Sequence, residues 1–274
     1  MMSGISVAYG RNIMVSHHQS HGSNNMNTSN NMNTEHLQIG AFIFPKIDQM
    51  DFTGPFEVFS RIPGAKIHIL AESIEPLHDA AGLVLTPTQL LSDAPSLDLV
   101  FVPGGAGVNE VLKNPRLLEA LRELIERTPW VMSVCTGALI LGATGFLKNR
   151  KATTHWASHY LLEAYAAIPV RNRVVVDDHL ITTAGVTAGF DGALRTVELI
   201  AGTEVAQSIQ VALEYAPEPL PWMNQSQTMP DEIMVKVRQQ MRRVIEEREA
   251  LARDYAGSRI GGRSGISRIA AIDE

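Results

Sequence analysis

The chain has 274 residues, of which 45% are hydrophobic, and its formal net charge is -6. This much apolar material can fill the core of one large domain, whereas the acidic balance and the lack of a long basic run exclude the surface typical of a nucleic-acid binder. The single cysteine cannot form an internal disulfide, and no apolar stretch is typical of a signal peptide or a membrane span. We therefore expect a cytoplasmic protein with no nucleic-acid or membrane partner.

Residues 1–36 are rich in Asn, Ser, His and Met and show no apolar periodicity. Because such a composition cannot bury a hydrophobic face, we predict a disordered N-terminal extension; a start codon placed too early is also possible. Three histidines of this segment, His17, His18 and His21, lack partners of fixed geometry, so we predict no metal site there.

Residues 37–222 carry the pattern of an ordered domain. The apolar run at 39–45 predicts a buried strand, and a helix with several aromatic residues follows it. Further strands are predicted at 65–70 and 97–102, and a short strand at 83–86 belongs to a hairpin. The chain therefore opens with alternating strands and helices.

The clearest helix signal begins at Asn114. Asparagine is a preferred helix cap and Pro115 suits the first turn. Apolar residues recur behind them at helical spacing, at Leu117, Leu118, Leu121, Leu124 and Ile125. The remaining expected elements are a strand at 130–134, helices at 138–144, 155–164, 188–201 and 203–215, and two strands at 173–178 and 179–183.

Strands that alternate with helices indicate a mostly parallel sheet covered by helices on both faces. The predicted fold is therefore a doubly wound α/β sandwich. Residues 223–256 are predicted to be a C-terminal helical extension that serves in packing or dimerisation, with apolar residues along one side at Ile233, Val237, Met241, Val244 and Leu251. Residues 257–274 are predicted to be a flexible tail.

Cys135 stands where the predicted strand at 130–134 turns into a helix of small residues. In such a nucleophile elbow the turn lifts the side chain out of the sheet, and small residues like Ser133 and Gly137 let strand and helix approach closely. Because a helix N-terminus stabilises negative charge, we expect Cys135 to be more thiolate-like than a free cysteine. A buried structural cysteine is the competing interpretation.

A nucleophile needs a proton partner, and two residues are candidates. Asp51 follows the first strand, at the sheet edge where ligands bind in open α/β folds, but it can equally be a helix cap. His155 is the rival base, or a structural histidine beside Trp156. Gly104 and Gly105 follow a buried strand and form either an oxyanion cradle or a plain turn. A phosphate loop is disfavoured, because the Gly-Lys-Ser/Thr ending is missing.

Five segments of residues 37–222 together resemble the DJ-1/PfpI superfamily, and within it the isocyanide hydratase (isonitrile hydratase) branch. They read DFTGP, VPGG, SVCTG, ATTHW and LEYAP, at 51–55, 102–105, 133–137, 152–156 and 213–217. Asp51 stands where DJ-1 itself has Glu, and Thr136 where the PfpI protease-like members have His. Both differences favour the hydratase branch.

The resemblance implies that Cys135 is the nucleophile, Asp51 the general acid/base and Thr136 a neighbour that shapes the polar pocket. It implies covalent hydration of an isocyanide to an N-formamide through a thioimidate, in a homodimer whose small-molecule partners are the isocyanide and water, with no metal or organic cofactor. Gly104 and Gly105 remain candidates for binding the substrate. Asp51 can donate a proton near neutral pH only if burial beside an anionic sulfur raises its pKa.

Ala184 departs from the resemblance, because relatives commonly have glycine there, and a stiffer backbone would alter motion of the helix that follows. Two other functions stay open. A DJ-1-like redox sensor or glyoxal-processing enzyme would use the same cysteine. A ligand-sensing regulator of the AraC type would need a helix-turn-helix domain, but the residues after Trp222 provide one convincing helix and no basic recognition surface.

Overall fold

The computed structural model describes residues 36–218 and 231–260. A seven-stranded sheet with the strand order β10-β11-β7-β6-β1-β2-β5 forms its centre. All neighbouring strands of this sheet are parallel except β10 and β11, which are antiparallel. The predicted fold class, a mostly parallel sheet between helices, is confirmed. The predictions for residues 1–35, 219–230 and 261–274 fall outside the described residues.

The strands of the central sheet are β1 (Gln38–Phe42), β2 (Lys66–Ala71), β5 (Gln89–Leu90), β6 (Leu99–Val102), β7 (Trp130–Val134), β10 (Val174–Asp177) and β11 (Leu180–Thr183). Two small strand pairs are β3 (Leu77–His78) with β4 (Val84–Leu85), and β8 (Lys151–Ala152) with β9 (Ile168–Pro169). The helices are α1 (Gln49–Phe59), α2 (Val108–Leu112), α3 (Pro115–Glu126), α4 (Gly137–Ala143), α5 (Ala188–Ala201), α6 (Thr203–Ala212) and α7 (Asp231–Ile260), with 3-10 helices η2 (Leu91–Asp93) and η3 (Trp156–Tyr165).

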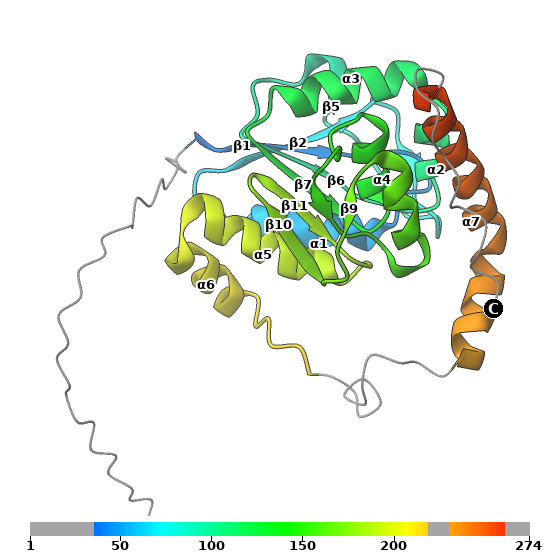
Figure 1. Ribbon diagram of the computed structural model, residues 1–274. Coiled ribbons are helices and arrows are strands. Elements are labelled where there is room, and N and C mark those ends of the chain that lie inside the picture. The colour runs from blue at the N-terminus through cyan, green and yellow to red at the C-terminus, as the bar shows by residue number, and fades with distance from the viewer. Residues whose placement is uncertain (1–35, 219–230, 261–274) are drawn as a thin grey trace, which may run out of the picture. The chain divides into compact units, whose positions relative to one another are not determined.

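The sheet is buried because helices cover both of its faces (Figure 1). Helices α1, α5 and α6 pack together on one face, whereas α2, α3, α4 and η3 cover the other, and α7 packs against η3 and α2. Every residue of β6 is buried, as its uninterrupted apolar run predicts for a central parallel strand. This arrangement brings the carboxyl ends of β1, β6 and β7 to one edge of the sheet.

Helix α3 forms as its sequence predicts. The Asn114 side chain accepts a hydrogen bond of 3.1 Å from the Leu117 amide, and Pro115 occupies the first turn. Four residues of the predicted apolar stripe are buried, and Leu118 is half-buried. The cap and the stripe together fix where this helix begins and which face it turns to the sheet.

Several elements differ from the sequence prediction: β1 ends at Phe42 rather than at 45, and α2, β5, β8 and β9 were not predicted. The segment predicted as an α-helix at 155–164 is the 3-10 helix η3, which Ala166 ends in the left-handed conformation. Helix α6 ends at Ala212 rather than at 215, because Glu214 has φ +50° and turns the chain away. Helix α7 continues to Ile260, past the predicted end at 256. Within residues 36–218 and 231–260, no helix combines the length and the apolar character needed to cross a membrane.

Candidate active site

Cys135 sits in a strained turn between β7 and α4. Its φ of +54° lies in the left-handed region, which is costly for a residue with a side chain. The turn is held by the Cys135 amide, which donates to the carbonyls of Thr183 (3.2 Å) and Ala184 (3.0 Å), and by the Thr154 hydroxyl, which donates to the Cys135 carbonyl (2.6 Å). The strand, the turn and the helix have the geometry of the predicted elbow.

Gly137 makes this elbow possible. A Cβ atom at this position would lie 2.1 Å from the carbonyl oxygen of Val102, at the end of the neighbouring strand β6. Only glycine therefore allows α4 to begin this close to the sheet. The prediction that a small residue two positions after Cys135 permits the approach agrees with this contact.

Asp51 lies in the first turn of α1 and is fully buried. It does not cap the helix, because the cap is Asp48, whose side chain accepts from the Met50 amide. Oδ2 of Asp51 instead accepts a hydrogen bond of 2.9 Å from the amide of Gly104. Oδ1 is buried and has no hydrogen-bond partner among the described residues. Oδ2 is thus held in place by Gly104, whereas Oδ1 is available for proton transfer.

Burial raises the pKa of Asp51 to about 7, and the negative charge of Asp48 adds to this effect. The hydrogen bond from the Gly104 amide and the nearby Cys135 thiol lower the pKa of Asp51, but by less. The raised pKa agrees with the expectation from sequence, although its main cause is burial rather than an anionic sulfur. Asp51 can therefore both donate and accept a proton near neutral pH.

The Cys135 thiol differs from the expectation. Burial raises its pKa well above the ordinary value, and the nearby charge of Asp51 raises it further. The amide of Thr136, at the N-terminus of α4, lowers the pKa as predicted, but this effect is smaller. The prediction of a thiolate-like cysteine was therefore wrong for the resting protein, because it left out burial and the adjacent carboxyl.

Gly104 and Gly105 connect the acid to the elbow. Gly104 donates to Asp51, and the Gly105 amide donates to the hydroxyl oxygen of Thr136 at 3.1 Å. A Cβ atom on Gly104 would lie 2.5 Å from the Thr136 nitrogen and 2.9 Å from Asp51 Oδ2. The Gly104 backbone therefore packs directly against both Thr136 and Asp51. Because both glycine amides are bonded within the protein, an oxyanion would have to compete for them.

His155 does not join this group. Its Nδ1 accepts a 3.3 Å hydrogen bond from the Ala157 amide, which makes it the cap of η3, and its ring packs on Trp156. Burial lowers the pKa of His155, and the charge of Arg248 lowers it further, so its neutral form is favoured. No hydrogen bond joins His155 to Cys135 within the described part of the chain. The structural interpretation fits these contacts.

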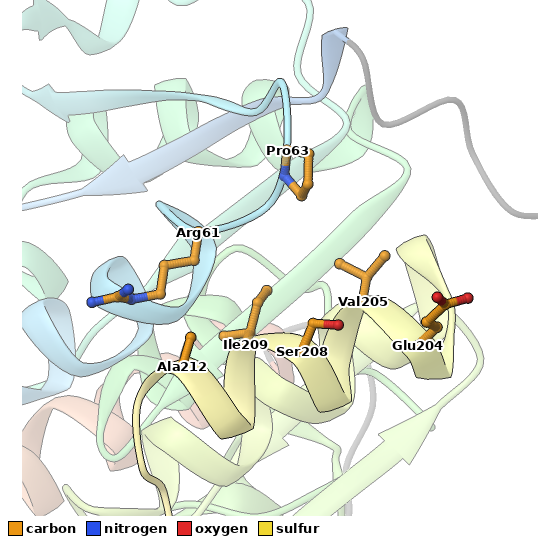
Figure 2. Close-up of a pocket in the computed structure, with 7 residues that line it drawn as sticks. All are labelled: Arg61, Pro63, Glu204, Val205, Ser208, Ile209 and Ala212. Atoms are coloured by element: carbon orange, nitrogen blue, oxygen red, sulfur yellow. The ribbon is translucent and has the colours of Figure 1, made fainter.

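Cys135 is 6% exposed, and two surface pockets lie elsewhere. One, of about 460 Å³, lies between the residues that follow α1 and helix α6, where Val205 and Ile209 face Pro63 (Figure 2). The other, of about 330 Å³, lies between α5 and α6. Neither is lined by Cys135 or Asp51.

The sequence model of the DJ-1/PfpI family matches residues 38–199, more than half of the chain. The chain belongs to the DJ-1/PfpI family. The resemblance inferred from the five short segments is thereby confirmed.

Several relatives of known name are similar to this DJ-1/PfpI protein. Isonitrile hydratase of Pseudomonas putida is 44% identical over 183 residues, which cover 67% of this chain and 80% of that protein. A glutathione-independent glyoxalase of Caenorhabditis elegans is 26% identical over 148 residues, which cover 53% and 79%. A solved structure, a THiJ/PfpI family protein from Pseudomonas syringae, matches with a TM-score of 0.76 and 35% identity over 86% of this chain and 98% of that one.

Sequence reasoning missed one charged residue near the site. Arg248 lies on α7, beyond the DJ-1/PfpI match, and its side chain is buried and donates to the carbonyl of Gly105 at 3.2 Å. A signal for it existed, because Arg248 falls at helical spacing between Val244 and Leu251, within the apolar stripe of α7. An arginine on an apolar face is either paired or functional.

Proposed function

We propose that this DJ-1/PfpI protein hydrates isocyanides to N-substituted formamides, with Cys135 as the nucleophile and Asp51 as the general acid/base. The observation that carries the proposal is the nearness of these two side chains, joined through Gly104 and Thr136 at the elbow, in a chain 44% identical to isonitrile hydratase of Pseudomonas putida. Covalent addition to a carbon requires a nucleophile and a general acid/base that exchanges protons near neutral pH.

In the first step, the Cys135 sulfur attacks the terminal carbon of R–N≡C and a C–S bond forms. The thiol proton passes to Asp51, which delivers it to the same carbon, so that the product is the thioimidate R–N=CH–S–Cys135. The raised pKa of Asp51, about 7, suits this transfer because neither direction is strongly uphill at neutral pH. No net charge accumulates in the buried site.

In the second step, water adds to the thioimidate carbon while a proton reaches the nitrogen. The tetrahedral intermediate R–NH–CH(OH)–S–Cys135 then collapses. Its hydroxyl proton returns to the sulfur through Asp51, the C–S bond breaks, and R–NH–CHO leaves. Every atom of the isocyanide and of one water appears in the formamide, so the protein ends as it began and needs no co-reactant.

Thr136 and the two glycines have supporting roles in this proposal. The Gly104 amide fixes Oδ2 of Asp51, which leaves Oδ1 to exchange the proton. Thr136, held by the Gly105 amide, presents its own amide to the sulfur and offsets negative charge there. In this proposal, Gly104 and Gly105 act by positioning Asp51 and Thr136. Their amides contact the substrate only when it displaces the hydrogen bond to Asp51 or to Thr136.

A second candidate is a glyoxal-processing activity, which the similarity to the glutathione-independent glyoxalase of Caenorhabditis elegans supports at 26% identity. The two activities are separated by initial rates with an aryl isocyanide and with methylglyoxal. We expect formamide from the first, and loss of that activity in the Cys135→Ala protein. Lactate from methylglyoxal with no formamide from the isocyanide would overturn the choice.

We further propose a cytoplasmic homodimer, as the resemblance implies. Light scattering of the purified protein tests the oligomeric state, and a mass of one chain would contradict it. Fractionation of the producing cells tests the compartment.

A further inference from the structure

Among the described residues, Arg248 is a buried cation that forms no salt bridge with a carboxylate. It is 2% exposed, and its guanidinium donates to Asn109 Oδ1 (2.9 Å), to Ser158 Oγ (3.1 Å) and to the Gly105 carbonyl (3.2 Å). All three acceptors are neutral. Among the salt bridges of the described residues, none includes Arg248. Because burying a charge is costly unless an opposite charge offsets it, this arrangement needs an explanation.

The negative group that most favours the charge of Arg248 is the sulfur of Cys135, followed by the hydroxyls of Tyr165 and Tyr160 and the carboxylate of Glu247. The two tyrosines are neutral at physiological pH because burial raises their pKa values. Glu247 is 41% exposed and bonds Lys113 and Asn109 instead. The resting Cys135 thiol is also neutral because burial raises its pKa, but it is the group among these that must become an anion in the proposed reaction, and Arg248 holds the Gly105 turn beside it.

The charges that act on the Cys135 sulfur also single out Arg248. The charged side chains that act on Cys135 are Asp51 and Asp48, which disfavour its anion, and Arg248, which favours it. Arg248 is the one cation in this set. A short chain of contacts joins them: Arg248 holds the Gly105 carbonyl, the Gly105 amide holds the Thr136 hydroxyl, and the Thr136 amide contacts the sulfur.

Helix α7 is fixed firmly enough to present this charge. It runs beside α2 (Figure 1) and packs against η3, and side chains before and after Arg248 in the sequence hold it there. Glu247 pairs with Lys113 on the loop after α2, and Tyr160 of η3 donates to Glu249. Nearer the start of α7, the guanidinium of Arg238 lies 5.3 Å from the Trp156 ring centroid. Both α2 and η3 adjoin the loops that form the site.

We propose that Arg248 is a positioning residue of the active site, which fixes the turn at Gly105 and offsets the negative charge that develops on the Cys135 sulfur. The C-terminal helix α7 is then part of the reactive unit rather than only a packing element. The proposal rests on Cys135 being the reactive thiol, as in the proposed function, but not on the identity of the substrate.

A merely structural role predicts something different. If Arg248 only packs α7, its loss lowers the free energy of unfolding, because three acceptors lose their donor, but it does not act on the thiol. Arg248→Met would then leave the thiol unchanged. If its charge acts on the sulfur, a neutral residue must make the thiolate harder to form even when the fold is intact.

The test is the rate at which iodoacetamide alkylates the protein as a function of pH. The chain has one cysteine, so the rate reports Cys135 alone, and it follows the thiolate fraction. We expect Arg248→Gln and Arg248→Met to move the midpoint of the profile upward by about one pH unit. That shift is about a tenfold lower rate at a pH below the midpoint. Arg248→Lys, which keeps the charge, moves it less.

Arg253→Met is the matched control, because Arg253 lies on the same helix and is exposed. Its profile should superimpose on that of the parent, and circular dichroism should verify the fold of each variant. A folded neutral variant with the parent's profile would overturn the proposal, as would Arg248→Lys shifting as far as Arg248→Gln. Alkylation needs no isocyanide, so failure of the hydration assay leaves this test intact.

Discussion

Asp51 and Cys135 are both buried, and each disfavours a negative charge on the other. Two such groups lose their protons as a pair, with apparent pKa values that belong to both. The form that holds one proton is the one suited to the proposed reaction, since it contains a nucleophile and an acid at once. Arg248 and the Thr136 amide favour this form, because both stabilise charge on the sulfur.

The buried carboxyl of Asp51 makes the stability of the protein depend on pH. Its pKa is about 7 when folded and about 4 in an unfolded chain, so the folded state binds the proton more tightly. The contribution of protonated Asp51 to the free energy of unfolding is fully present below pH 4 and is lost as the pH rises to 7. We predict that Asp51→Asn is more stable than the parent above pH 7, by up to about 4 kcal/mol.

Urea unfolding at pH 5 and pH 8 measures this effect, and the advantage of Asp51→Asn must be larger at pH 8. Asp254→Asn is the control, because Asp254 is exposed and belongs to no salt bridge among the described residues, so its substitution should show no such difference. An equal advantage at both pH values would mean that Asp51 is not held in its neutral form.

At this scale, the sequence offered Cys135 and Asp51 as candidates for a nucleophile and its acid, because each follows a predicted strand at one edge of the sheet, and the structure places the two residues near each other. The sequence could not predict the raised pKa of Cys135, which depends on long-range burial. It also missed Arg248, whose acceptors Asn109 and Ser158 are 139 and 90 residues away in the chain.

The junctions between elements decide whether the site forms. Gly104, at the end of β6, touches the start of α4 and the Asp51 side chain, so a methyl group there has no room. We predict that Gly104→Ala destabilises the fold by about 1–3 kcal/mol, the usual cost of overpacking, and separates Asp51 from the elbow. Formamide production should fall together with stability.

Gly257→Ala is the matched control for that change. No atom lies within 4 Å of the position its Cβ would take, and the residue lies inside α7. Alanine is the better helix former, so thermal unfolding should show no loss of stability. Wild-type rate and stability in Gly104→Ala would contradict the close contact described above.

The elements with strong local signals were predictable. The cap and the apolar stripe of α3 and the apolar run of β6 are visible in the sequence. Less predictable were the ends of α6 and η3, because a single left-handed residue, Glu214 or Ala166, ends each helix without a glycine signal.

At the scale of the whole molecule, the alternation of strands and helices predicted a parallel sheet, but not the order of its strands. That order pairs β1 with β6 and β6 with β7, and these contacts decide that Asp51, Gly104 and Cys135 meet. The docking of α7 across η3 and α2 adds Arg248 to the same place. The site is therefore assembled from segments spread over nearly the whole described chain.

The central claim is that Cys135 forms a covalent bond to the substrate carbon. Mass spectrometry of the intact protein, quenched with acid shortly after mixing with an aryl isocyanide, tests it directly. The account predicts a transient mass increase equal to one isocyanide, on the peptide that contains Cys135 and absent from Cys135→Ala. Formamide made by Cys135→Ala at the parent's rate, with no adduct on the parent, would contradict it.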